Sequence, residues 1–124
     1  MNKRKPLGLA LLLTPLVALT ACTEIPASKQ TLKKHTIVYK VSHSTTGASI
    51  DIEYGYQTKK GKEYKYTDGT SRRTWREKRT TAKQRITYAG LDVTSEDTGD
   101  RITCEIIFDG KRLVRKTDTY TVSC

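Results

Sequence analysis

The sequence predicts an all-β domain, folded as an antiparallel β-sandwich of about seven strands. Two observations support this prediction. Apolar and polar residues alternate in short runs, which is the period of a strand with one buried face. Turn residues separate these runs about every eight to twelve residues, and no run shows the 3.6-residue period of a helix.

The clearest strand covers residues 101–108, where apolar residues occupy every second position. Asp109-Gly110 follows and predicts a two-residue type I′ turn, because both residues tolerate positive φ. A last alternating set, Tyr120, Val122 and Cys124, predicts a further strand. Counting outward from the turn gives three expected cross-strand pairs: Phe108 with Lys111, Ile106 with Leu113, and Cys104 with Arg115.

The remaining strands follow the same alternation. We expect them near residues 37–41, 50–56, 64–66 and 86–93, with turns at residues 44–47, 59–62, 68–69 and 95–99. Residues 75–83 are polar and fit either an edge strand or a long loop. Within residues 50–56, Asp51 and Glu53 fall on the solvent side, where charge usually serves solubility.

The N-terminal segment, residues 1–21, is typical of an export signal. Residues 3–5 are basic, and the apolar run over residues 7–19 is too short to span a membrane. Leu19-Thr20-Ala21-Cys22 then resembles a bacterial lipobox, in which the cysteine after the cleavage site receives the lipid. We therefore expect a lipoprotein that begins at lipidated Cys22 and is anchored in the outer leaflet of the cytoplasmic membrane. An ordinary secretory signal with a chance cysteine is the alternative.

Residues 22–35 are expected to form a flexible tether between the lipid and the domain. This segment is polar and rich in lysine, and its only large apolar residues are Ile25 and Leu32. Residues 36–124 have the length of a single sandwich. We expect one domain over these residues.

The remaining cysteines are expected to be structural. If Cys22 carries lipid, Cys104 and Cys124 are left as one pair in an oxidising compartment. A disulfide between them closes a loop of about twenty residues and stabilises the fold by about 3 kcal/mol. Catalytic thiols or a metal pair are the alternatives, but a zinc site needs more Cys or His residues than this chain offers. We expect neither a metal nor a cofactor.

The C-terminal block resembles the MmpS family of small exported proteins of actinobacteria. The resemblance rests on residues 102–106, 109–111 and 122–124, with further similarity at residues 39–41, 48–54, 74–75 and 89–91. It implies an immunoglobulin-like sandwich over residues 36–124. It also implies a non-catalytic role beside an MmpL-type transporter that exports lipids or siderophores. This chain departs from the family because a lipobox replaces the spanning helix and because the domain is more basic.

Positive charge is concentrated in two segments. The formal net charge is +10, or about +7 without the basic residues of the signal. Residues 59–85 contain eleven Lys or Arg and three acids, whereas residues 86–110 contain six acids and only Arg101 as a cation. Clustered charge steers anionic partners toward a surface. We therefore predict that residues 59–85 and 111–116 form a basic contact surface, which includes Lys59, Lys60, Lys62, Arg72, Arg73, Arg76, Arg79, Arg112 and Arg115.

Several partners remain open for such a surface. They are an MmpL-like transporter and an anionic envelope polymer or lipid headgroup. A phage- or prophage-encoded lipoprotein that blocks superinfection is another possible identity, and a merely solvated basic surface is the simplest interpretation. The tyrosines interleaved with Trp75 would suit single-stranded nucleic acid, but export removes that partner from reach.

An enzyme is not expected. The chain has two histidines, His35 and His43, and the order of its Ser, His and Asp residues alone does not exclude a triad. However, it has no Gly-x-Ser-x-Gly motif and no phosphate-binding glycine motif.

Overall fold

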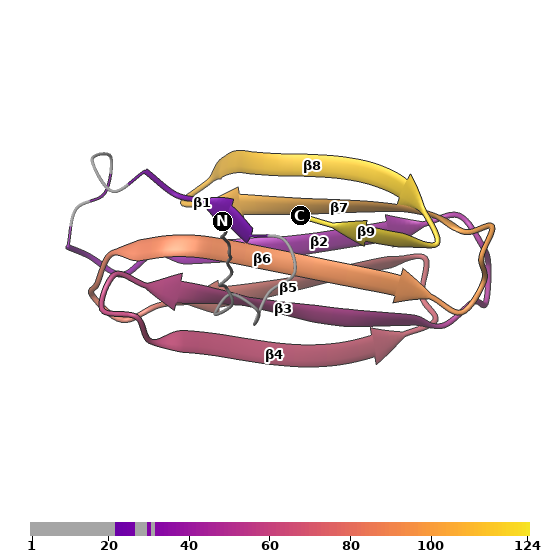
Figure 1. The fold of residues 1–124 in the computed structure, drawn as a ribbon, viewed down its shortest axis with the longest axis horizontal. Helices are drawn as coiled ribbons and strands as arrows, with labels where there is room; N and C mark the ends of the chain where they lie inside the picture. Colours follow the sequence, from indigo (N-terminus) through magenta and orange to yellow (C-terminus); the bar gives the residue numbers. More distant parts are fainter. Residues whose placement is uncertain (1–21, 27–29, 31) are drawn as a thin grey trace, which may run out of the picture.

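Two antiparallel sheets pack face to face as a β-sandwich in the computed structural model, which describes residues 22–26, 30 and 32–124. The five-stranded sheet has the order β1 (Cys22–Glu24), β6 (Ile86–Ser95), β3 (Ile50–Thr58), β4 (Glu63–Thr70), with β9 (Thr121–Ser123) also paired to β6. The four-stranded sheet has the order β5 (Thr74–Thr80), β2 (Thr36–His43), β7 (Arg101–Phe108), β8 (Lys111–Thr119). Strands β8 and β4 lie along opposite long edges (Figure 1). The expected sandwich is confirmed, with seven long strands and two of three residues.

The core forms where the inward-facing residues of both sheets meet. Every second residue of β2, β3, β6 and β7 is buried, as the alternation predicts. Tyr39 is fully buried, and its hydroxyl donates across the core to the carbonyl of Gly55 at 2.8 Å. Burial raises the pKa of Tyr39. Only glycine fits at position 55, because a Cβ there would overlap the carbonyl oxygen of Tyr64.

The predicted disulfide between Cys104 and Cys124 is confirmed, with a Cα–Cα distance of 6.1 Å. It joins the two sheets rather than two neighbouring strands, because Cys104 lies in β7 while β9, just before Cys124, pairs with β6. The chain crosses between the sheets at Tyr120, which has a positive φ of 73°. The covalent link therefore holds the sandwich closed at the end of the chain.

The hairpin at Asp109-Gly110 is confirmed, since both residues have positive φ, 49° and 85°. Its predicted register is right only at the first pair, Phe108 with Lys111. A bulge between Ile106 and Ile107 adds a residue to β8 and shifts the remaining pairs by one. The observed partners are Ile106 with Val114 and Cys104 with Lys116.

The predicted turn at residues 68–69 is wrong. Asp68 and Gly69 are paired with β3 inside β4, and the chain turns at residues 71–73 instead. The Asp68 carboxylate also accepts the indole N–H of Trp75 at 2.8 Å, which links β4 to β5. The polar stretch after it forms an edge strand, β5, one of the two alternatives left open above.

The segment expected to be a tether differs from that expectation in its described residues. Strand β1 pairs with β6, and Ile25, the residue after β1, is buried in the hydrophobic core. Gln30 is also buried, and its amide group donates to the carbonyl of Ile86 at 2.6 Å and accepts the N–H of the same residue at 2.9 Å. Strand β1 and Gln30 bond to backbone groups of β6 that would otherwise be unpaired at the sheet edge. The predicted signal, residues 1–21, lies outside the described residues. Across the part of the chain that the structure describes, no helix is long and apolar enough to cross a membrane.

Candidate functional site

The outer surface of the four-stranded sheet is strongly basic. Strand alternation turns every second residue away from the core, and among the described residues six cations and one acid face outward. We call this surface the basic face. It consists of Lys40, Arg76, Lys78, Arg101, Arg112 and Arg115, with Glu105 as the acid.

The outer surface of the five-stranded sheet has the opposite sign. Among the described residues its outward positions carry five acids and one cation, and we call this surface the acidic face. It consists of Glu24, Asp51, Glu53, Glu63 and Asp92, with Lys65 as the cation. The sandwich therefore separates its charge between two opposite surfaces.

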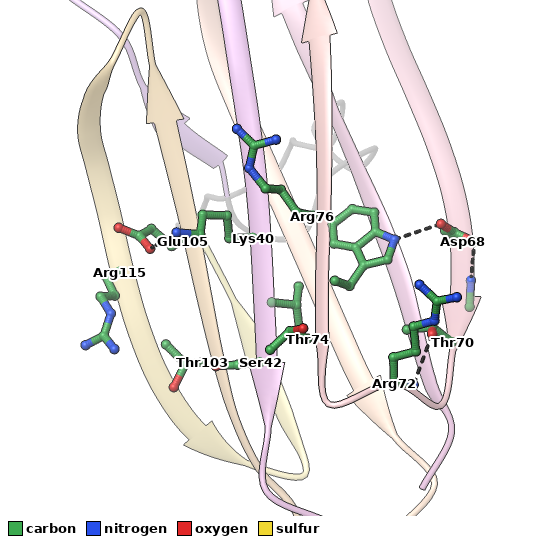
Figure 2. Close-up of a pocket in the computed structure, with 13 residues that line it drawn as sticks. Lys40, Ser42, Asp68, Thr70, Arg72, Thr74, Arg76, Thr103, Glu105 and Arg115 are labelled. Carbon is green, nitrogen blue, oxygen red and sulfur yellow. Dashed lines mark hydrogen bonds and ion pairs between the residues drawn. The ribbon is translucent and has the colours of Figure 1, made fainter. Parts of the chain in front are cut away.

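An open groove of about 780 Å³ is hollowed into the basic face beside the connection from β4 to β5. Figure 2 shows its charged row, Arg76, Lys40, Glu105 and Arg115, on four neighbouring strands. We call this site the arginine groove, after Arg72, Arg76 and Arg115 in its lining.

The two acids of the arginine groove are already engaged. Asp68 accepts the indole N–H of Trp75 and the backbone N–H of Gly69, both at 2.8 Å. Glu105 lies 2.8 Å from Arg112 and 3.9 Å from Lys40. Within the described residues, Arg72, Arg76 and Arg115 form no ion pair with a carboxylate. These three guanidinium groups remain available to an anion.

A row of hydroxyl groups runs next to the charged row. Its members occupy aligned positions on β5, β2, β7 and β8: Thr74, Ser42, Thr103 and Thr117. The last two hydroxyls lie 2.8 Å apart. The first three line the arginine groove, so a ligand there would meet hydroxyl groups as well as cations.

The structure separates the nine predicted contact residues into several places. Arg76, Arg112 and Arg115 lie on the basic face, and Arg72 lies at the end of the arginine groove. Arg73 donates from Nε to the carbonyl of His43 at 3.3 Å. The remaining predicted lysines sit in or next to the β3–β4 turn, at the other end of β4: Lys59, Lys60 and Lys62.

Arg79 is not part of the basic face, and its prediction as a contact residue stays a prediction. It points inward from β5, and its guanidinium lies 3.8 Å from the ring centroid of Tyr66. It also donates to the hydroxyl of Tyr54 at 3.0 Å and lies 3.6 Å from Glu77. The hydrogen bond to Tyr54 is the main cause of the raised pKa of Arg79. Arg79 therefore connects β5, an edge strand of the four-stranded sheet, to the tyrosines of β3 and β4 in the other sheet.

His43 and Asp100 form a fully buried pair, 2.7 Å apart. The other imidazole nitrogen of His43 lies 2.8 Å from the carbonyl of Arg72. Burial opposes the charge of Asp100, but hydrogen bonds from Ser95, the Thr45 N–H and His43 outweigh it and hold the pKa of the carboxyl well below its usual range.

This pair does not have the geometry of a catalytic triad. Ser95 donates its hydroxyl to Asp100 at 2.7 Å rather than lying against the imidazole. Both nitrogens of His43 face other acceptors, so the ring has no free site to take a proton from a nucleophile. The cluster instead ties the loop after β2 to the loop before β7.

His35 and Asp109 form a second pair, 2.6 Å apart, at the other end of β2. His35 is buried and stacks on Phe108, with ring centroids 5.0 Å apart. Burial raises the pKa of the Asp109 carboxyl, but hydrogen bonds from His35 and from the N–H of Thr36 lower it below its usual range. This pair fixes the β7–β8 turn against β2.

The predicted segments, residues 59–85 and 111–116, leave out two cations of the basic face, Lys40 and Arg101. Lys78 lies within residues 59–85 but was not named as a contact residue. The signal for Lys40 was present, because it stands between Tyr39 and Val41 in an alternating strand and must face outward. Its neighbours on the sheet could not be read from the sequence, since they come from strands far apart in the chain.

No group of three or more His, Cys, Asp or Glu side chains is placed to hold a metal ion within the described ranges. Comparison with protein-family models and with curated proteins found no match for this chain.

Proposed function

We propose that this chain is a non-catalytic lipoprotein whose basic face binds an anionic component of the cell envelope. The observation that carries the proposal is the separation of charge between the two outer faces. Stability does not require this separation, since surfaces selected only for solubility usually mix the two signs. A surface of one sign raises the local concentration of oppositely charged partners and speeds their association.

Anchoring at the membrane is the second part of the proposal, and the Leu19-to-Cys22 sequence supports it. The Cys22→Ala variant is expected to remain an unprocessed precursor without fatty acid. Metabolic labelling with palmitate tests this, and undiminished label in the variant would contradict lipidation at Cys22.

Binding is tested with the full chain in detergent micelles and two polyanions of different chemistry, polyphosphate and polyglutamate. The face variant carries Arg76→Glu, Arg101→Glu and Arg115→Glu. The matched control carries Lys59→Glu, Lys60→Glu and Lys62→Glu, which changes the net charge equally at the β3–β4 turn. We expect the face variant to lose affinity about a hundredfold and the control to lose less than about tenfold. Equal losses would show that only net charge matters, and the proposal would be wrong.

The resemblance to the MmpS family supports a related possibility, in which the anionic partner is the outer part of an MmpL-like transporter and the sandwich is of the immunoglobulin-like kind. The salt response separates the two partners. Binding to a polyanion weakens steeply as salt rises, whereas a packed protein interface weakens less. A shallow salt response with a transporter fragment, together with no polyanion binding, would favour the transporter.

A further inference from the structure

We infer that the arginine groove binds a phosphodiester chain that carries hydroxyl groups, such as a polyol phosphate. This inference rests on the proposed function and names the ligand class and its site. The free guanidinium groups of Arg72, Arg76 and Arg115 are its starting point. A guanidinium group presents two parallel N–H donors that match the oxygens of a phosphate group.

The spacing of these arginines favours a chain over a single anion. Arg76 lies on β5 and Arg115 on β8, with β2 and β7 between them. At about 4.8 Å per strand, their backbones are roughly 14 Å apart. In the structure the two guanidinium groups lie apart, on either side of the Lys40–Glu105 pair (Figure 2), so one phosphate group would not contact both without a change of side-chain conformation. A ligand with repeated phosphates that crosses the strands can do so.

The hydroxyl row indicates what lies between the phosphates. Thr74, Ser42 and Thr103 line the arginine groove beside its charged row (Figure 2). Hydroxyl groups both donate and accept, so they can bind the hydroxyls of a polyol or sugar as well as phosphate oxygens. The Lys40–Glu105 pair, between Arg76 and Arg115, adds both a donor and an acceptor to this row.

The aromatic residues argue against a nucleic acid in the groove. Single-stranded nucleic acids bind through bases that stack on exposed aromatic rings. Trp75 lines the groove, but its N–H is bonded to Asp68 and its ring packs edge-on against Tyr54, with centroids 5.1 Å apart. The exposed tyrosines among the described residues, Tyr88 and Tyr120, are not in the groove lining.

The shape of the site favours a chain over a membrane surface. A flat anionic bilayer would contact all protruding cations of the basic face. It would not enter the groove, whose lining includes the buried residue Val41. A flexible chain can follow the groove across the strands.

The test compares two variants of the full chain in detergent micelles, each lacking three positive charges. The groove variant carries Arg72→Gln, Arg76→Gln and Arg115→Gln. The rim variant carries Lys78→Gln, Arg101→Gln and Arg112→Gln, which lie on the basic face outside the groove lining. The probe is a short synthetic poly(glycerol phosphate), with oligothymidylate and phosphatidylglycerol vesicles as competitors at equal phosphate concentration.

We expect the groove variant to bind poly(glycerol phosphate) about a hundredfold more weakly than the parent, and the rim variant less than about tenfold more weakly. The logarithmic salt dependence of the groove variant should be shallower by about two, as for three lost phosphate contacts on a single chain. Circular dichroism checks that both variants remain folded.

Equal losses in the two variants, or a parent that prefers oligothymidylate or vesicles, would overturn the inference while leaving the basic face as a binding surface. A parent that binds no polyanion at all would instead overturn the proposed function. A groove variant that binds oligothymidylate as the parent does, but has lost poly(glycerol phosphate), would support the inference most strongly.

Discussion

The charged residues of the sandwich fall into two regions that differ in how their charge is satisfied. Asp100 and Asp109, at the two ends of the sandwich, and Arg79, between β4 and β5, each interact with several partners within the fold. On the basic face, Arg76 and Arg115 have no carboxylate partner among the described residues. Charges of the first kind stabilise the sandwich. Charges of the second kind have no carboxylate partner within the described residues and remain available to a ligand.

This comparison separates stability from binding. Removing a satisfied charge leaves its buried partners without a hydrogen bond, which costs free energy of unfolding. Removing a free surface charge leaves no such group, so the effect should appear only in binding. The predictions below proceed from the largest expected effect to the smallest.

The largest loss of stability is expected from Asp100→Asn. This change leaves His43 buried beside a neutral amide and weakens the hydrogen bonds from Ser44, Thr45 and Ser95. Breaking a buried pair in this way costs about 3–5 kcal/mol. Urea unfolding followed by circular dichroism measures the change. A loss below about 1 kcal/mol would show that the pair is not a main stabilising element.

Acid should weaken the parent through the same carboxyl groups. The folded-state pKa values of Asp100 and Asp109 are lowered, so their stabilising contribution is complete above the unfolded pKa, about 3.9, and is lost as the pH falls through the folded values. We expect the urea midpoint to fall below about pH 4. The Asp100→Asn variant should fall less steeply over this range, and an identical slope would contradict the role of Asp100.

A smaller loss is expected from Arg79→Gln. The change removes the contact with the Tyr66 ring and the hydrogen bond to Tyr54. Together these interactions should stabilise the fold by about 1–2 kcal/mol. Affinity of the folded variant for polyanions should stay close to that of the parent, since Arg79 faces inward. A large loss of affinity without loss of stability would place Arg79 in the binding surface after all.

The smallest effect on stability is expected from Arg76→Gln. This side chain is exposed and has no carboxylate partner in the described chain, so the free energy of unfolding should change by less than about 0.5 kcal/mol. Affinity for polyphosphate should nevertheless fall several-fold. A stability loss as large as that of Arg79→Gln would remove the distinction between the two regions.

Local pattern was sufficient to predict the sandwich and the Asp109-Gly110 turn, and the number of cysteines left after Cys22 predicted the disulfide. Alternation predicted the buried side of β2, β3, β6 and β7, and positive φ at Asp109 and Gly110 follows from residue type. The bulge after Ile106 could not be predicted, because Leu113 and Val114 are both apolar and the apolar pattern does not show which of them is paired with Ile106. The crossing at Tyr120 was also missed, since a non-glycine residue at positive φ has no clear sequence signal.

The candidate site was only partly predictable, because it depends on which strands are neighbours. Clustering along the sequence grouped Arg79 with Arg76, although three positions along a strand place them on opposite sides. The same clustering omitted Lys40, which pairing between β2 and β5 brings directly beside Arg76. Sheet order in a sandwich comes from contacts between distant segments, and no local pattern encodes it.

The most direct test of the basic face as a binding surface is an NMR titration of the full chain in detergent micelles with poly(glycerol phosphate). The acidic face provides the internal control. We expect the amide signals of Ser42 and Thr103, in the arginine groove, to shift with increasing ligand, while those of Glu53 and Asp92 stay in place. Equal shifts on both faces, or shifts confined to the β3–β4 turn, would contradict the proposal that the basic face binds the ligand.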